Sequence, residues 1–330
     1  MKSPQPGSIS KLHCLPTVNY GKHPIYNPSL ANITLRDRTK AFLEYMPALW
    51  DGLYLYKENQ KRLIENRNLY RSEPTPINFD TFSREGILTL NVEPKLIEEL
   101  KIQLNKHIGY DMDSVLLDEP EARHYVTFSE CDPKIKALHD NILARLNVVN
   151  IAKQYCKASN VRISGFKLRI QDTDSEFKQN LFEDVRYKVP TTNYMHIDSS
   201  FRRSQIKMIL YLNQVTTSNG PFCYVSGSHK IKDPIWRKIS RRVNHKNGYQ
   251  SWDAAGRERF MKLPNFLRHK AEFGNDLLPE NKYHKIVMDE EVTVTSKDGN
   301  FVLFDNAGIH RGGLIEAGRR ISLQWSMEAV

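Results

Sequence analysis

Short strand-like runs fill the second half of the chain, and they constrain its fold more than any other feature. They are rich in β-branched and aromatic residues, and turn residues separate them, as in the Thr-Ser-Asn-Gly stretch at 217–220. The runs cover residues 161–170, 192–197, 206–215, 221–225, 292–295, 300–304 and 320–325. Short strands after a largely helical N-terminal third favour helices packed on a mostly antiparallel β-barrel or sandwich, an α+β fold with a mainly β core.

Most of the helical periodicity lies in the first half. Residues 35–67 carry apolar side chains at roughly helical spacing and predict one or two helices, which Pro47 kinks or divides. Further helices are predicted over 93–107 and 133–156, and a turn followed by a short strand over 82–92. Residues 1–34 show neither period and are interpreted as an irregular arm.

One long segment interrupts the strands. Residues 231–285 contain helix-like stretches and are too long for a simple connection. We therefore expect an N-terminal arm with helices over 1–77 and a β domain over 78–330 that carries this insertion. The two parts are expected to form one compact unit.

Length and composition exclude several classes of protein. The chain has 330 residues, enough for one large domain or two small ones, and no apolar run approaches the roughly 18 residues that span a bilayer. No apolar block follows the first residues, so neither a membrane partner nor a secretory signal is expected. The four cysteines are scattered without a CxxC pair, which favours a reducing, cytoplasmic compartment and argues against a cysteine-built zinc site.

The positive charge is concentrated in the insertion. Lys and Arg total 48 against 38 Asp and Glu, a net charge of +10. Residues 230–270 contain 12 Lys or Arg and 3 acidic residues, so this segment alone carries +9. Such a segment is typical of proteins that bind nucleic acid, acidic lipid or an anionic small molecule, although a solvated helix face explains it equally well.

Two histidines and a carboxylate form the candidate metal site. His196 and Asp198 are two residues apart in a strand-like run, so their side chains point to the same face. His310 follows another run. Two His and one carboxylate on one side of a metal are the facial triad of non-haem Fe(II) oxygenases, although a lone His-x-Asp also occurs by chance.

An arginine near the C-terminus supports this interpretation. An oxygenase of this kind holds an anionic co-substrate, and the guanidinium fork of arginine matches its far carboxylate. Arg320 and Ser322 lie two apart on one strand and share a face. Arg319 is the alternative, but its side chain would point with the apolar residues Ile321, Leu323 and Trp325.

The ordered set of motifs resembles the phytanoyl-CoA dioxygenase family of Fe(II)/2-oxoglutarate oxygenases over roughly residues 78–330. The matching pieces are Met-His-Ile-Asp at 195–198, Tyr-Leu-Asn-Gln-Val at 211–215, Asn-Gly-Pro-Phe-Cys-Tyr-Val-Ser-Gly-Ser-His-Lys at 219–230, His-Arg-Gly-Gly at 310–313 and Arg-Arg-Ile-Ser at 319–322. The resemblance implies a double-stranded β-helix (jelly-roll, cupin-like) with N-terminal helices packed on it. It also implies iron bound by His196, Asp198 and His310, and 2-oxoglutarate held by an arginine of the last core strand. The family pattern makes His229 structural, on a turn.

The implied chemistry uses Fe(II), 2-oxoglutarate and O2, with succinate and CO2 as coproducts. The resemblance predicts a dioxygenase that hydroxylates an unactivated C–H bond of a small molecule, because the retained Asp198 argues against halogenation. Desaturation or ring closure with the same cofactors is an alternative, and a protein that binds or acts on nucleic acid is a less favoured one, since no known nucleic-acid-binding module is present. The sequence does not predict the oligomeric state.

The insertion is expected to form a lid over the pocket. Both of its ends lie on core strands, and aromatic residues alternate with its basic ones. We expect Arg241, Arg242 and Trp252 to help attract an anionic substrate by electrostatic focusing.

Overall fold

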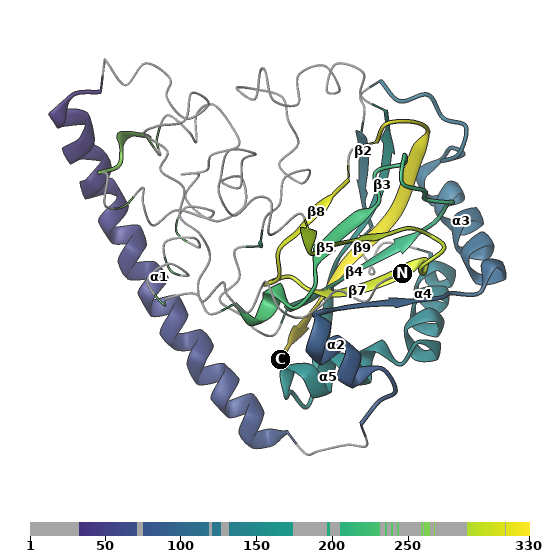
Figure 1. The fold of residues 1–330 in the computed structure, drawn as a ribbon, viewed down its shortest axis with the longest axis horizontal. Helices are drawn as coiled ribbons and strands as arrows, with labels where there is room; N and C mark the ends of the chain where they lie inside the picture. The colour runs from purple at the N-terminus through teal and green to yellow at the C-terminus, as the bar shows by residue number, and fades with distance from the viewer. Residues whose placement is uncertain are drawn as a thin grey trace.

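Two antiparallel β-sheets and the helices around them make up the fold (Figure 1). The computed structural model describes residues 33–70, 75–118, 121–126, 132–173, 197–198, 205–231, 289–313 and 315–330. Within the insertion it also describes 235, 239, 243, 259, 261–264 and 267.

The larger sheet has six strands in the order β1-β7-β4-β9-β3-β2. These strands are β1 (Ile87–Leu90), β2 (Glu121–Tyr125), β3 (Val161–Asp172), β4 (Gln205–Tyr211), β7 (Phe301–Asp305) and β9 (Arg319–Ala329). Every neighbouring pair is antiparallel. The smaller sheet, in the order β6-β5-β8, contains β5 (Phe222–Val225), β6 (Glu291–Val294) and β8 (His310–Gly312).

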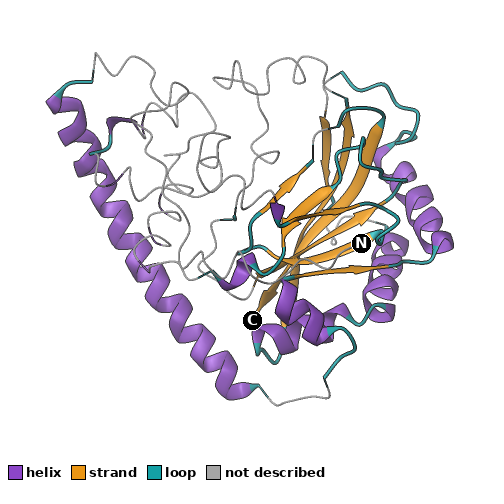
Figure 2. Ribbon diagram, in the orientation of Figure 1, coloured by secondary structure: helices purple, strands orange, loops and turns teal. Residues whose placement is uncertain are grey.

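Four helices cover the outer face of the larger sheet (Figure 2). They are α2 (Phe79–Glu85), α3 (Pro94–Ile108), α4 (Pro133–Arg145) and α5 (Val148–Cys156). In α3, Leu96, Leu100 and Leu104 form a buried stripe at helical spacing. This stripe joins apolar side chains of β3, β4, β7 and β9 in the main core.

The inner face of the larger sheet packs against the smaller sheet. Ile209, Tyr211, Val302 and Phe304 from β4 and β7 meet Phe222, Tyr224 and Val294 from β5 and β6 in a second apolar cluster, the inner cluster. Each strand of the larger sheet therefore presents one face to the helices and the other to the space between the sheets.

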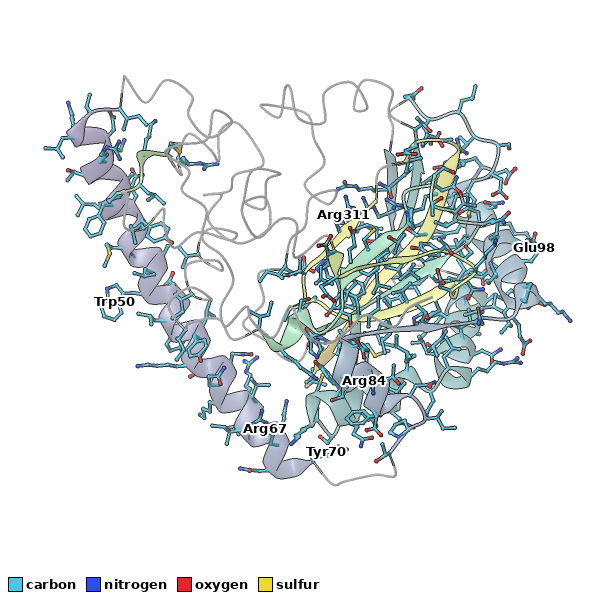
Figure 3. All side chains as sticks on the ribbon, in the orientation of Figure 1. Trp50, Arg67, Tyr70, Arg84, Glu98 and Arg311 are labelled. Carbon is cyan, nitrogen blue, oxygen red and sulfur yellow. The ribbon has the colours of Figure 1, made fainter. Side chains whose placement is uncertain are left out.

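The N-terminal helix α1 (Leu35–Leu69) lies to one side of the sheets (Figure 1). A capping box between Thr34 and Asp37 starts it. Its buried residues cluster with Ile239, Val243 and other described residues of the insertion, not with the clusters of the two sheets. Gly52 permits this approach, because a Cβ there would lie 2.8 Å from Val243 Cγ2. On its opposite side, Trp50 points away from the rest of the described chain (Figure 3).

The described structure corrects several expectations. Pro47 lies inside a single continuous helix and does not divide it. The helix predicted over 133–156 is two helices, because Asn147 adopts a left-handed conformation with φ of 52°. Strands β2 and β8 were not predicted. The predicted arm over 1–34 lies outside the described residues except Ile33 and Thr34, and the predicted run over 192–197 lies outside them except Ile197. Six of the seven predicted strand runs correspond to strands of the two sheets.

The described helices include none with the length and apolar character needed to cross a membrane.

Candidate metal centre and cavity

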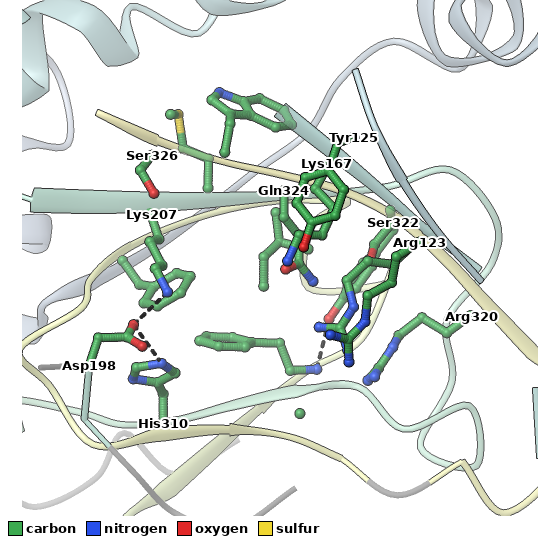
Figure 4. A pocket seen from close by; sticks show the side chains of 18 residues that line it. Arg123, Tyr125, Lys167, Asp198, Lys207, His310, Arg320, Ser322, Gln324 and Ser326 are labelled. Carbon is green, nitrogen blue, oxygen red and sulfur yellow. Dashed lines mark hydrogen bonds and ion pairs between the residues drawn. The ribbon is translucent and has the colours of Figure 1, made fainter. Parts of the chain in front are cut away.

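A cavity of about 360 Å³ lies between the two sheets (Figure 4). Side chains of the larger sheet line most of it, and the smaller sheet contributes Phe222 of β5 and His310 and Gly312 of β8. Its volume lies at the lower end of the range that small-molecule sites occupy, roughly 300–1,000 Å³. The cavity therefore has room for small ligands.

His310 has a fixed orientation at the start of β8. Its Nδ1 donates a hydrogen bond to the carbonyl oxygen of Gly308, 2.8 Å away, and only 4% of the residue is exposed. Because Nδ1 carries the proton in this arrangement, the lone pair of Nε2 points toward the cavity. Metal-binding histidines are commonly held in this way.

Asp198 reaches the same place from a segment that precedes β4. Its backbone N–H donates to the carbonyl oxygen of Asn306 at 3.1 Å, which joins residue 198 to the turn between β7 and β8. Asp198 Oδ2 then lies 3.3 Å from His310 Nε2. Residues 112 positions apart are thus brought side by side.

The spacing of these two atoms fits a shared metal ion. Two ligand atoms that each lie about 2.1 Å from one metal at right angles are about 3 Å apart. His196 lies outside the described residues, although its neighbours Ile197 and Asp198 are described. No group of three or more metal-binding side chains forms among the residues that the structure does describe.

Hydrogen bonds and close packing hold the turn between β7 and β8 in place. Tyr155 donates a hydrogen bond to the buried carboxylate of Asp305 at 2.6 Å, and the other oxygen of that carboxylate accepts from the N–H of Ala307 at 2.8 Å. A Cβ on Gly308 would lie 1.9 Å from Tyr224 Oη, so only glycine fits there. This packing fixes the carbonyl that orients His310.

The turn at 226–229 supports β8 from the other side. Ser228 Oγ accepts a hydrogen bond from the N–H of Ile309 at 2.7 Å, and Ser226 pairs with Glu85. His229 Nε2 contacts the carbonyl oxygen of Ser83 at 3.2 Å, away from His310 and Asp198. The structure places the Ser-Gly-Ser-His motif as a brace for the strand that carries His310.

A pair of hydrogen bonds also fixes β8 within its sheet. Arg311, labelled in Figure 3, donates two hydrogen bonds to the carboxylate of Glu291 on β6, at 2.6 and 2.9 Å. Burial alone would lower the pKa of Arg311, but the hydrogen bonds to Glu291 outweigh it and raise that pKa. The guanidinium therefore stays charged and holds β8 against β6 across β5.

Lys207 is a further charged neighbour of the candidate metal site. Its Nζ lies 2.6 Å from Asp198 Oδ2, the same oxygen that faces His310 (Figure 4). Lys207 projects from β4 among apolar residues, and the sequence analysis did not single it out. The sequence feature that could have indicated it is a lone lysine in the otherwise apolar run Ile-Lys-Met-Ile-Leu at 206–210.

Arg320 and Ser322 lie across the cavity from Asp198 and His310 (Figure 4). Arg320 is 5% exposed and donates two hydrogen bonds to Gln171 Oε1 on β3, at 3.1 and 2.7 Å. Ser322 Oγ is buried, and no hydrogen-bond partner for it occurs in the described part of the chain. A ligand oxygen in the cavity would provide the hydrogen-bond partner that this buried hydroxyl needs.

Arg319 has a different environment. It donates two hydrogen bonds to Asp172, at 2.6 and 2.7 Å, and one each to the backbone carbonyls of Met112 and Val115. It does not line the cavity. The prediction that the faces of this strand alternate is confirmed, since Ile321, Leu323 and Trp325 join the main core.

The cavity wall between the two ends is apolar and shielded from water. Ile209, Tyr211, Phe222 and Phe304 line the cavity and also belong to the inner cluster. Burial raises the pKa of Tyr211 to about 12, so its hydroxyl stays protonated, donates to Val294 and accepts from the N–H of Phe222. Low polarity around the site strengthens every electrostatic interaction in it.

Three more cationic side chains on the cavity face were missed by the sequence analysis. They are Arg123 on β2 and Lys167 and Arg169 on β3. The run Phe-Lys-Leu-Arg-Ile-Gln at 166–171 alternates strictly, but such a pattern normally indicates a strand with one face in solvent. The predicted lid residues Arg241, Arg242 and Trp252 lie outside the described residues.

Comparison with known proteins identifies relatives at the level of a family. The family profile described as phytanoyl-CoA dioxygenase matches residues 130–319, more than half of the chain. The match includes His196, Asp198 and His310 and ends one residue before Arg320. No curated protein sequence matches the chain.

Solved structures resemble the chain at low sequence identity. HygX from Streptomyces hygroscopicus, solved with nickel and 2-oxoglutarate bound, is 16% identical, with 78% of this chain and 88% of that chain covered and a TM-score of 0.43. The epimerase SnoN from nogalamycin biosynthesis, in complex with Fe3+, alpha ketoglutarate and nogalamycin RO, is 13% identical, with 76% and 81% covered and a TM-score of 0.45. AviO1 from Streptomyces viridochromogenes is 14% identical, with 76% and 92% covered and a TM-score of 0.41.

Proposed function

The chain belongs to the phytanoyl-CoA dioxygenase family, and from this premise we propose that it hydroxylates an unactivated C–H bond of a small anionic molecule. The predicted family is confirmed, and with it the class of enzyme, a 2-oxoglutarate-dependent non-haem iron oxidoreductase. Fe(II), 2-oxoglutarate and O2 are the cofactors and co-substrates of this family, which acts on small molecules. The hydroxylation and the anionic substrate are our proposal.

One observation carries the assignment of the site. Asp198 Oδ2 and His310 Nε2 lie 3.3 Å apart at one side of a cavity, and Arg320 and Ser322 lie at the other. We assign Asp198, His310 and His196 to Fe(II). Arg320 and Ser322 are assigned to the far carboxylate of 2-oxoglutarate, because a guanidinium fork and a hydroxyl on one strand face match a carboxylate.

Bound iron and 2-oxoglutarate would supply the oxidising power, with release of succinate and CO2. The residues of the chain have other tasks. The hydrogen bond from His310 Nδ1 to Gly308 keeps the imidazole in the tautomer that a metal requires. Gln171 holds the Arg320 guanidinium in place, while Phe222 and Phe304 exclude water from the space between the two ends.

We further propose that the two sheets form a double-stranded β-helix. The observed order of strands, with an inner cluster that joins the two sheets, supports this. The retained Asp198 supports hydroxylation rather than halogenation, because it supplies the carboxylate of the facial triad. Cytoplasmic location also belongs to the proposal, and the free, buried thiols of Cys156 and Cys223 support it.

Removal of the metal ligands tests the proposal. His310→Ala and His196→Ala are expected to abolish Fe(II) binding and succinate formation, with circular dichroism unchanged. Asp198→Gly should lose hydroxylation while some iron binding remains, because one anionic ligand is removed and a coordination position opens.

The exposed His107 provides the matched control. His107→Ala should keep wild-type iron content and turnover. The site assignment is wrong if His310→Ala also keeps them. Mass spectrometry of the products distinguishes a gain of one oxygen from the loss of two hydrogens that desaturation or ring closure would give.

A further inference from the structure

We propose that Tyr155 of α5 is a positioning residue for the metal site, because through Asp305 it fixes the turn that holds Asp198 and His310. This inference rests on the proposed function, since it concerns how these two metal ligands reach their places. Tyr155 does not line the cavity, so it acts on the site through other residues.

Two backbone carbonyls of one turn hold the two ligands. The turn covers residues 306–309 and joins β7 to β8. The carbonyl oxygen of Asn306 accepts from the N–H of Asp198 at 3.1 Å, and that of Gly308 accepts from His310 Nδ1 at 2.8 Å. The distance of 3.3 Å between Asp198 Oδ2 and His310 Nε2 therefore depends on where these two carbonyls lie.

Each of the two carbonyls belongs to a peptide unit whose N–H is held by a side chain. The Asn306 carbonyl shares its unit with the N–H of Ala307, which donates to Asp305 Oδ1 at 2.8 Å. The Gly308 carbonyl shares its unit with the N–H of Ile309, which donates to Ser228 Oγ at 2.7 Å. A peptide unit is planar, so a side chain that fixes the N–H also fixes the direction of the carbonyl.

The chain thus has a separate support for each ligand. The carboxylate of Asp305 determines the place of Asp198 through the first peptide unit, and the hydroxyl of Ser228 determines that of His310 through the second. Asp305 also shapes the turn between the two units, because its own carbonyl oxygen accepts from the N–H of Gly308 at 3.0 Å.

Tyr155 fixes the carboxylate of Asp305 from the helix layer. Its hydroxyl donates to Asp305 Oδ2 at 2.6 Å, a length typical of charge-assisted hydrogen bonds. Its ring packs edge-on against Phe82 of α2, with centroids 4.8 Å apart, and its centroid lies 6.4 Å from that of His229 (Figure 1 shows α2 beside α5). Packing from two sides holds the ring, so the hydroxyl has a fixed place.

The burial of Asp305 makes this hydrogen bond important. Only 3% of the residue is exposed, and a buried carboxylate is held by the donors that the protein supplies. Without the Tyr155 hydroxyl the carboxylate has one donor fewer and turns toward those that remain. Such a rotation moves the N–H of Ala307, and with it the carbonyl that holds Asp198.

Tyr155→Phe tests this arrangement, because it removes the hydroxyl and keeps the ring. The metal-free full chain would be titrated with Co(II), whose visible absorption depends on the geometry of its ligands. The variant should bind Co(II) at least fivefold more weakly, toward the roughly 10- to 100-fold that loss of a supporting hydrogen bond costs metal sites, with an altered absorption of the bound ion. Asp305→Asn should give the same two changes, since its amide nitrogen cannot accept a hydrogen bond.

Tyr110→Phe is the matched control. Tyr110 also pairs its hydroxyl with a half-buried side chain, that of His124 on β2, but it does not line the cavity. Both Tyr→Phe variants should lower the melting temperature, and only Tyr155→Phe should change the affinity for Co(II) and its absorption. A lower melting temperature of Tyr155→Phe with unchanged Co(II) affinity and absorption would show a merely structural role and overturn the proposal.

Hydrogen exchange of the metal-free chain tests the turn independently of the metal. A peptide that covers residues 305–310 should exchange faster in Tyr155→Phe than in the wild type, whereas β6 (Glu291–Val294) should be unchanged. Equal exchange at the turn would overturn the proposal. A wild-type chain that binds no Co(II), or a His310→Ala variant that binds it equally well, overturns the proposed function and the metal role of Tyr155 with it. Faster exchange at the turn identifies that case, because it shows that the support by Tyr155 exists.

Discussion

Replacing Arg320 or Arg319 with alanine should produce two different defects, although the residues are adjacent. Arg320 lines the cavity, whereas Arg319 binds Asp172 and the backbone carbonyls of Met112 and Val115. We expect Arg320→Ala to weaken 2-oxoglutarate binding with a modest effect on stability. Arg319→Ala should destabilise the fold and leave 2-oxoglutarate binding close to wild type.

The magnitudes follow from the contacts that each variant removes. Hydrogen bonds from a charged group contribute about 1.5–3 kcal/mol, so loss of the Arg320 fork should weaken 2-oxoglutarate binding roughly 10- to 150-fold. Arg319 is largely buried and makes two hydrogen bonds to one carboxylate, so its removal should cost the fold a similar 1.5–3 kcal/mol, estimated at about 2–4 °C in melting temperature.

Anaerobic titration of the iron-loaded variants with 2-oxoglutarate measures the first effect, and thermal unfolding measures the second. Arg320→Lys is a useful intermediate, because it keeps the charge but loses the fork and should recover only part of the affinity. Equal losses of 2-oxoglutarate affinity in the two alanine variants, or a larger loss in Arg319→Ala, would refute the assignment of Arg320.

Three other perturbations test separate parts of the structure. Lys207→Met should tighten Fe(II) binding roughly fivefold, equivalent to about 1 kcal/mol, because the ammonium no longer competes for Asp198. A metal titration measures this effect, and weaker binding would mean that Lys207 instead orients the carboxylate. His139 is buried against Phe166 and Trp325, and burial lowers its pKa despite its contact with Asp140. Below pH about 6.5 the unfolded chain therefore takes up a proton that the folded chain resists. The free energy of unfolding should then decrease as the pH is lowered below this value, by up to about 1.4 kcal/mol per pH unit. Burial also lowers the pKa of His124, which contributes a loss of the same sign. Urea unfolding at pH 7.5 and 5.5 should therefore show a larger loss in the wild type than in His139→Phe, and equal losses would contradict the role of His139. Changing both Arg241 and Arg242 to Glu should weaken substrate affinity, and this loss should shrink as the salt concentration rises. An unchanged salt dependence would contradict the prediction that the insertion over 231–285 forms a lid that attracts an anionic substrate.

Where the sequence predicted structure well, a local pattern and its environment agreed. The leucines of α3 at helical spacing face one core, and Pro94 and Gly109 delimit the helix. Strand β9 alternates polar and apolar residues because it separates the cavity from the main core. In such elements the spacing of side chains along the chain already determines which face is buried.

Where prediction from the sequence failed, the deciding contacts joined segments distant in the chain, or the local pattern was too weak to identify the element. The three residues of β8 are too few to show a period, and the strand exists because β5 pairs with it. The sequence of β2, Glu-Ala-Arg-His-Tyr, has low β propensity, and its pairing with β3 defines it. At Asn147, one residue in a left-handed conformation divides a helix whose apolar period continues.

The sequence by itself determined the family, the candidate iron ligands and the face on which Arg320 and Ser322 lie, because these depend on motifs and on the two-residue period of a strand. Only the tertiary structure decided where the polar faces of β2 and β3 lie. Arg123, Lys167 and Arg169 have the alternation of a strand exposed to water, but the smaller sheet packs over the inner face of their sheet and leaves them lining a cavity. Periodicity shows that a face is polar, but it does not show what lies opposite, because that depends on contacts between segments far apart in the chain.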